Sequence, residues 1–183
     1  MIYDGNADLD KEVVLHKTNG KYTPEIWAGD FPERALDSLD LVVLSPGVPT
    51  DLPLVKSFYE KGLPVWSEVE LAYRTGKGEV LAITGTNGKT TTTALLGKIM
   101  GDARESVFVV GNIGTAYTSK SLEMREDSVT VAEISSFQLE TIKEFHPAAS
   151  AITNITEDHL KPPSHDGRVY PRERVYHRKS DDG

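Results

Sequence analysis

The stretch Val80–Met100 constrains the fold of this chain most strongly, because its residue order is that of a strand, a glycine-containing loop and a helix. Residues 80–83 (VLAI) are all apolar, which suits a strand covered on both faces. Gly85 permits a sharp backbone turn where a Cβ would clash, and a helix is expected to begin near Lys89. This order indicates an α/β fold with a parallel sheet.

The loop GTNGKTT (residues 85–91) has the residue types of a phosphate-binding loop. Unpaired backbone amides and the positive end of the helix dipole are expected to converge on an anion there. Lys89 can reach terminal phosphates and the Thr90 hydroxyl can bind Mg²⁺, although the loop is shorter than the common G-x-x-x-x-G-K-[ST] pattern. The alternative is a glycine turn that caps an ordinary helix. The residues expected to bind a nucleotide are Gly85, Thr86, Asn87, Gly88, Lys89, Thr90 and Thr91.

Composition excludes several classes of protein. The 183 residues carry a formal net charge of −8, so no basic face is available and we expect no nucleic-acid partner. Cysteine is absent, which rules out disulfides and thiolate metal ligands. No apolar run is long enough to span a bilayer, and the N-terminal sequence has neither the basic nor the apolar part of a signal peptide. We therefore expect a cytoplasmic monomer without membrane insertion.

The segment before Gly78 is expected to alternate strands and helices. It contains an apolar run at 41–44, a turn at 45–49, a helix-like stretch at 52–61, an extended piece at 63–66 and a helix at 68–74 capped by Ser67. The sequence TGKG at 75–78 breaks this pattern and predicts a domain boundary before the strand at Val80.

Polar clusters follow three further apolar runs, at the strand ends where parallel sheets bind ligands. The runs are 107–110, 129–134 and 149–155, and the clusters are GNIG (111–114), EISSFQ (133–138) and NITEDH (154–159). Beside a phosphate loop, Glu133 and His159 can complete Mg²⁺ coordination for phosphoryl transfer. The alternatives are that Glu133 caps the next helix and that His159 is a surface histidine.

Four of these motifs together resemble the central domain of the Mur ligases. They are GTNGKTTT (85–92), GNIG (111–114), EISSFQLE (133–140) and NITEDHL (154–160), and SPGVP (45–49) and SEVELAYR (67–74) extend the resemblance upstream. The resemblance implies a partial Rossmann-like domain at 1–77, which binds the UDP substrate, and the first part of a P-loop-type parallel-sheet ATPase domain at 78–160.

The resemblance is greatest to the members that use ATP to add D-glutamate to UDP-N-acetylmuramoyl-L-alanine through an acyl phosphate. It implies that Lys89 stabilises the transferring phosphoryl group, that Thr90 binds one Mg²⁺, and that Glu133 and His159 hold a second. It also implies that Asn112, Ser135 and Gln138 line the acyl end of the UDP-sugar and that Ser45 and Gly47 line its nucleotide side.

The chain departs from the family at both ends. We expect the resemblance not to extend to the family's first βα unit, to the end of its ATPase domain with the carbamylated lysine, or to the domain that holds D-glutamate. We therefore expect no turnover from this chain alone. The alternatives are a non-catalytic remnant that binds nucleotide or UDP-sugar, and a different P-loop phosphotransferase such as a small kinase.

Residues 161–183 resemble no part of the family and lack apolar periodicity, so we expect a disordered tail. Back-translation with permissible codons and removal of a single nucleotide after the Leu160 codon produces NRHHTMEEYIRVKE. This string resembles the family's continuation and places a lysine where the carbamylated one is expected. The hypothesis is a single-nucleotide insertion, and the coding DNA tests it.

Overall fold

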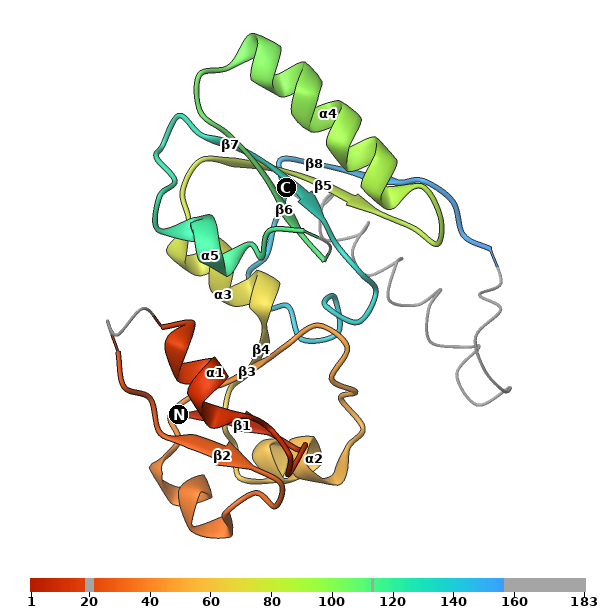
Figure 1. Cartoon of the computed structure of the whole chain (residues 1–183). Coiled ribbons are helices and arrows are strands. Elements are labelled where there is room, and N and C mark those ends of the chain that lie inside the picture. Colours follow the sequence, from red (N-terminus) through yellow and green to blue (C-terminus); the bar gives the residue numbers. More distant parts are fainter. Residues whose placement is uncertain (19–21, 113, 157–183) are drawn as a thin grey trace. The chain divides into compact units, whose positions relative to one another are not determined.

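The computed structural model describes residues 1–18, 22–112 and 114–156, which form two compact units (Figure 1). The first unit contains Met1–Leu41 and Asp51–Pro64, and the second contains Val42–Thr50 and the chain from Val65. The predicted α/β class is confirmed, since every strand pair in the described ranges is parallel. No helix in these ranges is both long and apolar enough to cross a membrane. The predicted tail lies outside them.

The first unit is built on a parallel pair of short strands, β1 (Ile2–Asp4) and β2 (Ile26–Ala28). Helix α1 (Lys11–His16) lies between them in sequence, and a 3₁₀ helix (Glu33–Ser38) and α2 (Pro53–Glu60) follow. Helix α2 confirms the helix predicted there. The other four elements are missed by sequence patterns, because each is at most six residues long and α1 buries none of its residues.

The second unit begins with a short parallel pair followed by a helix. Strand β3 (Val42–Leu44) pairs with β4 (Val65–Ser67), and α3 (Glu68–Thr75) follows β4 directly. The side-chain oxygen of Ser67 accepts a hydrogen bond from the N–H of Glu70 at 3.2 Å. The predicted cap of this helix is therefore confirmed.

A four-stranded parallel sheet, in the order β6-β7-β5-β8, forms the centre of the second unit. Its strands are β5 (Glu79–Thr84), β6 (Val107–Gly111), β7 (Val129–Glu133) and β8 (Ala149–Ile152). Each confirms an apolar run identified in the sequence, although β8 ends at Ile152, earlier than predicted. The accompanying helices are α4 (Lys89–Ala103) and α5 (Thr118–Ser121), of which α5 was not predicted.

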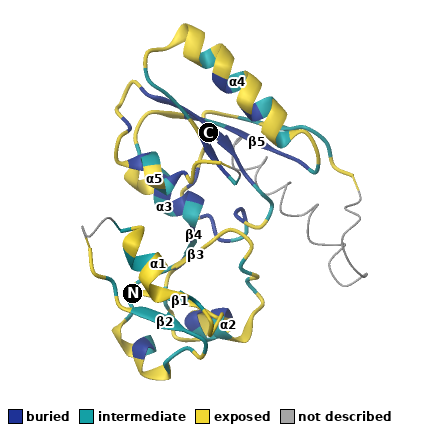
Figure 2. Cartoon of the chain, in the orientation of Figure 1, coloured by how far each residue is buried: buried dark blue, intermediate teal, exposed yellow. Residues whose placement is uncertain are grey.

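Helix α4 covers one face of this sheet, and α3 and α5 lie on the other (Figure 1). On the α3 face, Val80 and Ala82 of β5 share a buried cluster with Val69 of α3. On the α4 face the approach is close, because a Cβ at Gly97 would lie 2.3 Å from Cγ2 of Val109. The two inner strands, β5 and β7, are largely buried, whereas the outer side of α4 is exposed (Figure 2).

Glu70 of α3 is fully buried and joins α3 to the segment after β7. Its carboxylate accepts hydrogen bonds from the backbone N–H groups of Lys143 at 2.7 Å, Glu144 at 2.8 Å and Phe145 at 3.0 Å. Arg74 donates a fourth hydrogen bond from Nε at 2.7 Å. Burial raises the pKa of Glu70, but these hydrogen bonds outweigh it and hold the pKa below its ordinary value. Glu70 is thus an ionised carboxylate in the interior of the unit.

Candidate functional site

The predicted loop and helix are both present at the carboxyl end of β5. Gly88 is the N-cap of α4 and has a φ of 81°, in the left-handed region that favours glycine. The first-turn N–H groups of Lys89, Thr90 and Thr91 have no acceptor within the helix, as in any α-helix. No side chain in the described residues caps α4, so these N–H groups can donate to a ligand. This geometry suits an anion and is also compatible with the alternative of an ordinary glycine-capped helix.

Two of the loop amides are not free, which corrects the expectation that the whole loop presents unpaired N–H groups. The N–H of Thr86 donates to the backbone oxygen of Asn154 at 3.0 Å, and the N–H of Asn87 donates to Asn154 Oδ1 at 3.0 Å. The segment after β8 therefore occupies one side of the loop. Sequence reasoning placed Asn154 in the polar cluster NITEDH but gave it no role, because its partner Asn87 lies 67 residues away.

The ammonium group of Lys89 folds back over the loop. Its Nζ donates to the carbonyl oxygen of Gly85 at 2.7 Å and to that of Thr86 at 3.0 Å. A lysine ammonium has three N–H donors, so one remains for a ligand. Lys89 is therefore held in place by the loop itself.

Glu133 is the last residue of β7, an inner strand of the sheet that pairs with β5, the strand before this loop. In the strand register it lies opposite Gly111 of β6 and opposite Ile83 of β5. Its backbone oxygen accepts from the N–H of Asn112 at 2.9 Å. Side chains alternate between the two faces along a strand. Ala132 lies on the face covered by α3, so its neighbours Val131 and Glu133 lie on the face covered by α4. Helix α4 and Glu133 thus share one face of the sheet.

The carboxylate of Glu133 is only 2% exposed, and its Oε1 has no hydrogen-bond partner among the described residues. A buried, unpartnered carboxylate oxygen is costly unless something binds it. The described residues between β7 and β8 contain no helix, so the alternative that Glu133 caps one is wrong. Oxygen ligands are those that Mg²⁺ prefers, so the Glu133 carboxylate suits one such ion, and the exposed Thr90 carries a hydroxyl that suits another. His159, the third predicted ligand, lies outside the described residues.

No cluster of three or more metal-ligating His, Asp or Glu side chains is found among the described residues. The predicted ligands inside these ranges therefore amount to one carboxylate and one hydroxyl.

The residues predicted to bind the acyl end of the substrate follow β6, in the case of Asn112, and β7, in the case of Ser135 and Gln138. Gln138 is 2% exposed, and its Oε1 accepts from both the N–H and the hydroxyl of Ser135, at 2.9 and 3.0 Å. The Nε2 of Gln138 has no partner among the described residues, so it keeps a free donor. Asn112 is half-buried at the adjacent strand end. These three residues therefore lie at the ends of neighbouring strands.

The predicted nucleotide-side residues lie in the turn after β3. The N–H of Val48 donates to the backbone oxygen of Ser45 at 3.2 Å, and Gly47 within this turn has a φ of 87°. Thr50 donates a hydrogen bond to the carboxylate of Glu140, which ties the turn to the segment that carries Gln138. The turn is exposed and accessible to a ligand.

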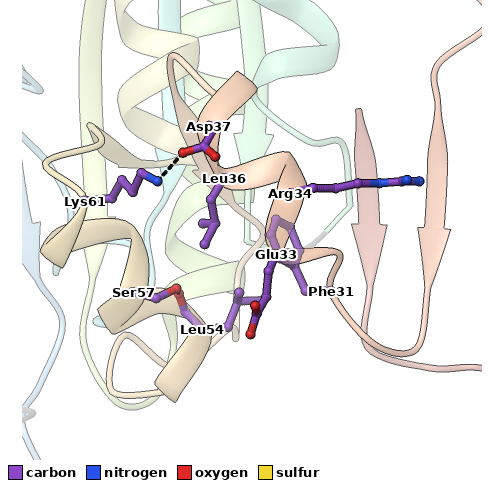
Figure 3. Close-up of a pocket in the computed structure, with 8 residues that line it drawn as sticks. All are labelled: Phe31, Glu33, Arg34, Leu36, Asp37, Leu54, Ser57 and Lys61. Carbon is purple, nitrogen blue, oxygen red and sulfur yellow. Dashed lines mark hydrogen bonds and ion pairs between the residues drawn. The ribbon is translucent and has the colours of Figure 1, made fainter.

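A cavity of about 550 Å³ in the first unit contains none of the predicted site residues (Figure 3). Residues of the 3₁₀ helix and of α2 line it, and Lys61 and Asp37 form an ion pair at its edge. Arg34 lies over the ring of Trp27, 5.4 Å from the ring centroid. We assign no ligand to this cavity.

Comparison with known proteins identifies relatives of this chain. A family model described as Mur ligase middle domain matches residues 83–167. The chain is 58% identical over 160 residues to the UDP-N-acetylmuramoylalanine–D-glutamate ligase of Lachnospira eligens, a match covering 87% of this chain and 35% of that protein. It is 53% identical, over the same shares of both chains, to the same-named ligase of Lachnoclostridium phytofermentans. The chain thus spans about a third of the length of these relatives.

Two solved structures are similar in fold. One is the UDP-N-acetylmuramate:L-alanyl-gamma-D-glutamyl-meso-diaminopimelate ligase of Neisseria meningitides, with a TM-score of 0.57 and 16% identity over 97% of this chain and 59% of that one. The other is the UDP-N-acetylmuramate–alanine ligase of Thermotoga maritima, with a TM-score of 0.51 and 26% identity over 98% of this chain and 41% of that one.

Proposed function

Because this chain belongs to the Mur ligase family, we propose that it carries part of an ATP-dependent ligase that joins D-glutamate to UDP-N-acetylmuramoyl-L-alanine in peptidoglycan precursor synthesis. One structural observation supports this most directly. The uncapped first turn of α4 and Lys89 share a sheet face with the buried carboxylate of Glu133, whose Oε1 has no partner among the described residues. Such an arrangement suits phosphoryl transfer, which depends on positioning and on offsetting negative charge.

In the proposed reaction, the terminal phosphoryl group of ATP passes to the alanyl carboxylate and forms an acyl phosphate. The amine of D-glutamate then attacks the acyl carbon, and inorganic phosphate leaves. Lys89 would stabilise charge on the transferring group with its remaining N–H donor, and the first-turn amides of α4 would bind phosphate oxygens.

Mg²⁺, where bound, would offset charge on the phosphate oxygens. Thr90 would hold one ion, and Glu133 with His159 would hold a second. The second ion would be the partner that Oε1 of Glu133 lacks among the described residues.

The substrate would occupy both predicted groups of binding residues. Asn112, Ser135 and Gln138 would contact the acyl end, with the free Nε2 of Gln138 as a donor. Ser45 and Gly47 would contact the nucleotide side, and we assign residues 1–77 to the UDP-binding domain. We further propose that the protein acts as a monomer in the cytoplasm.

Nucleotide binding by this chain tests the proposal. Calorimetric titration with ATP and Mg²⁺ is expected to give saturable heat, and Lys89→Ala should weaken ATP binding roughly 10- to 100-fold, as for loss of a charge-assisted hydrogen bond. Lys98→Ala is the matched control, because Lys98 lies on the same helix, is exposed and pairs with Asp102. Absence of binding in the folded wild-type chain contradicts the proposed ATP site.

A second assay tests turnover. These 183 residues span about a third of the length of the relatives that they match, and we propose that by themselves they release no phosphate when both UDP-N-acetylmuramoyl-L-alanine and D-glutamate are supplied. Phosphate release that requires both substrates refutes this expectation. Phosphorylation of an unrelated acceptor supports the alternative of another phosphotransferase.

A further inference from the structure

Two consecutive peptide groups of the phosphate loop are held between Asn154 on one side and Lys89 on the other. The peptide between Gly85 and Thr86 donates its N–H to the Asn154 backbone oxygen at 3.0 Å, and its carbonyl accepts from Lys89 Nζ at 2.7 Å. The next peptide, which ends at Asn87, repeats the arrangement. Its N–H donates to Asn154 Oδ1 at 3.0 Å, and its carbonyl accepts from Lys89 Nζ at 3.0 Å.

A trans peptide is planar, and its N–H and C=O point in opposite directions. A partner that fixes the N–H therefore also fixes the direction of the carbonyl. Because Asn154 accepts both N–H groups, both carbonyls are directed toward the Lys89 ammonium. The position of the charge thus depends on a residue that does not touch it.

The side chain of Asn154 holds Asn87 as a neighbouring strand would. It accepts the Asn87 N–H through Oδ1 and donates from Nδ2 to the Asn87 carbonyl at 2.8 Å. The pairing of β5 with β8 ends at Thr84 and Ile152, so Asn154 extends the contact between these segments into the loop. A Cβ at Gly85 would lie 2.8 Å from the Asn154 oxygen, so this approach requires glycine.

We propose that Asn154 is a positioning residue for Lys89, which it acts on through the two loop peptides. A catalytic effect of Asn154 rests on the proposed function, because the position of the Lys89 ammonium affects catalysis only if Lys89 binds phosphate oxygens. The geometric role itself is independent of any ligand.

The reactivity of Lys89 measures this role without nucleotide. Reductive methylation of the full chain, followed by peptide mass spectrometry, gives a rate for each lysine, with the exposed Lys98 as internal reference. In Asn154→Ala, Lys89 should react roughly 2- to 10-fold faster, because the peptide between Thr86 and Asn87 loses the side-chain acceptor that orients its carbonyl toward Lys89. Thr156→Ala is the matched control, because Thr156 contacts the side chains of Thr86 and Asn87 and should leave the rate unchanged.

A second variant keeps the test valid if Asn154→Ala does not fold by circular dichroism. Asn154→Asp retains an acceptor for the Asn87 N–H, so Lys89 in a folded N154D chain should be methylated as slowly as in the wild-type chain. An unchanged Lys89 rate in folded N154A, or a fast one in folded N154D, overturns the proposal.

Nucleotide affinity then links this role to the proposed site. Asn154→Ala should weaken ATP binding more than AMP binding, and the N154A/K89A double variant should bind ATP no more weakly than K89A alone. Equal losses for ATP and AMP, or additive losses in the double variant, contradict action through Lys89. If the wild-type chain binds no ATP while Lys89 still reacts faster in N154A, the proposed function fails and the role of Asn154 stands.

Discussion

Replacing Glu70 with glutamine should destabilise the second unit far more than loss of an ordinary surface charge. The glutamine has the same shape, but its NH₂ group replaces an oxygen that accepts hydrogen bonds. The N–H of Phe145 is the donor that water cannot easily reach, since Phe145 is 1% exposed. An unsatisfied buried donor costs about 1–3 kcal/mol, and breaking a buried ionic contact costs about 3–5 kcal/mol. We expect E70Q to lower the free energy of unfolding by about 2–4 kcal/mol.

Asp102→Asn provides the contrast. Asp102 also pairs with a basic residue one helical turn away, Lys98, but both side chains are more than 70% exposed. An exposed pair of this kind contributes about 0.3–0.5 kcal/mol, so D102N should be nearly silent. Urea unfolding followed by circular dichroism measures both variants.

The effect of E70Q should depend on pH in a defined direction. The pKa of Glu70 is lowered in the folded state, so its contribution is complete above the unfolded-state value of about 4.3. It is lost as the pH falls through the lower, folded-state pKa. The gap between wild type and E70Q should therefore narrow in acid. A gap below about 1 kcal/mol at neutral pH, or one that does not narrow, refutes the reasoning.

Two glycines give further predictions. Gly111→Ala should destabilise the chain and weaken binding of ATP with Mg²⁺, because the new Cβ would lie 2.1 Å from the backbone oxygen of Glu133. Calorimetric titration measures the affinity, and an unchanged affinity for ATP contradicts the expected displacement of Glu133. Gly97→Ala should cost about 1–3 kcal/mol by overpacking against Val109, and Val109→Ala in the same chain should recover part of that loss in urea unfolding. Additive losses in the G97A/V109A double variant contradict a direct clash.

The sequence predicted those parts of the fold whose signals are local. The apolar runs identified all four strands of the main sheet, and Ser67 identified the start of α3. Elements such as β1 and α1 are short and have little buried surface, so they carry no periodic pattern. Their conformation depends on tertiary contacts rather than on local preference.

The candidate site shows the same division. Lys89 and Glu133 were identified because their neighbours in sequence are informative, and their placement at adjacent strand ends follows from a parallel sheet. Asn154 and Glu70 lie in motifs that the sequence revealed but were given no role, because the partners that define their roles lie 67 to 75 residues away. A hydrogen bond across such a separation leaves no pattern in a single sequence.

The contact between Asn154 and the loop also sets an order of assembly. Strand β5 and helix α4 are neighbours in sequence and can form early, whereas β8 must close a contact across 67 residues before Asn154 reaches Asn87. Closure of long-range parallel contacts is slow compared with helix formation. During synthesis, the loop can therefore emerge with its glycines and lysine in place and still lack its binding geometry. The shape of the phosphate loop is acquired only when the last strand of the described sheet joins it.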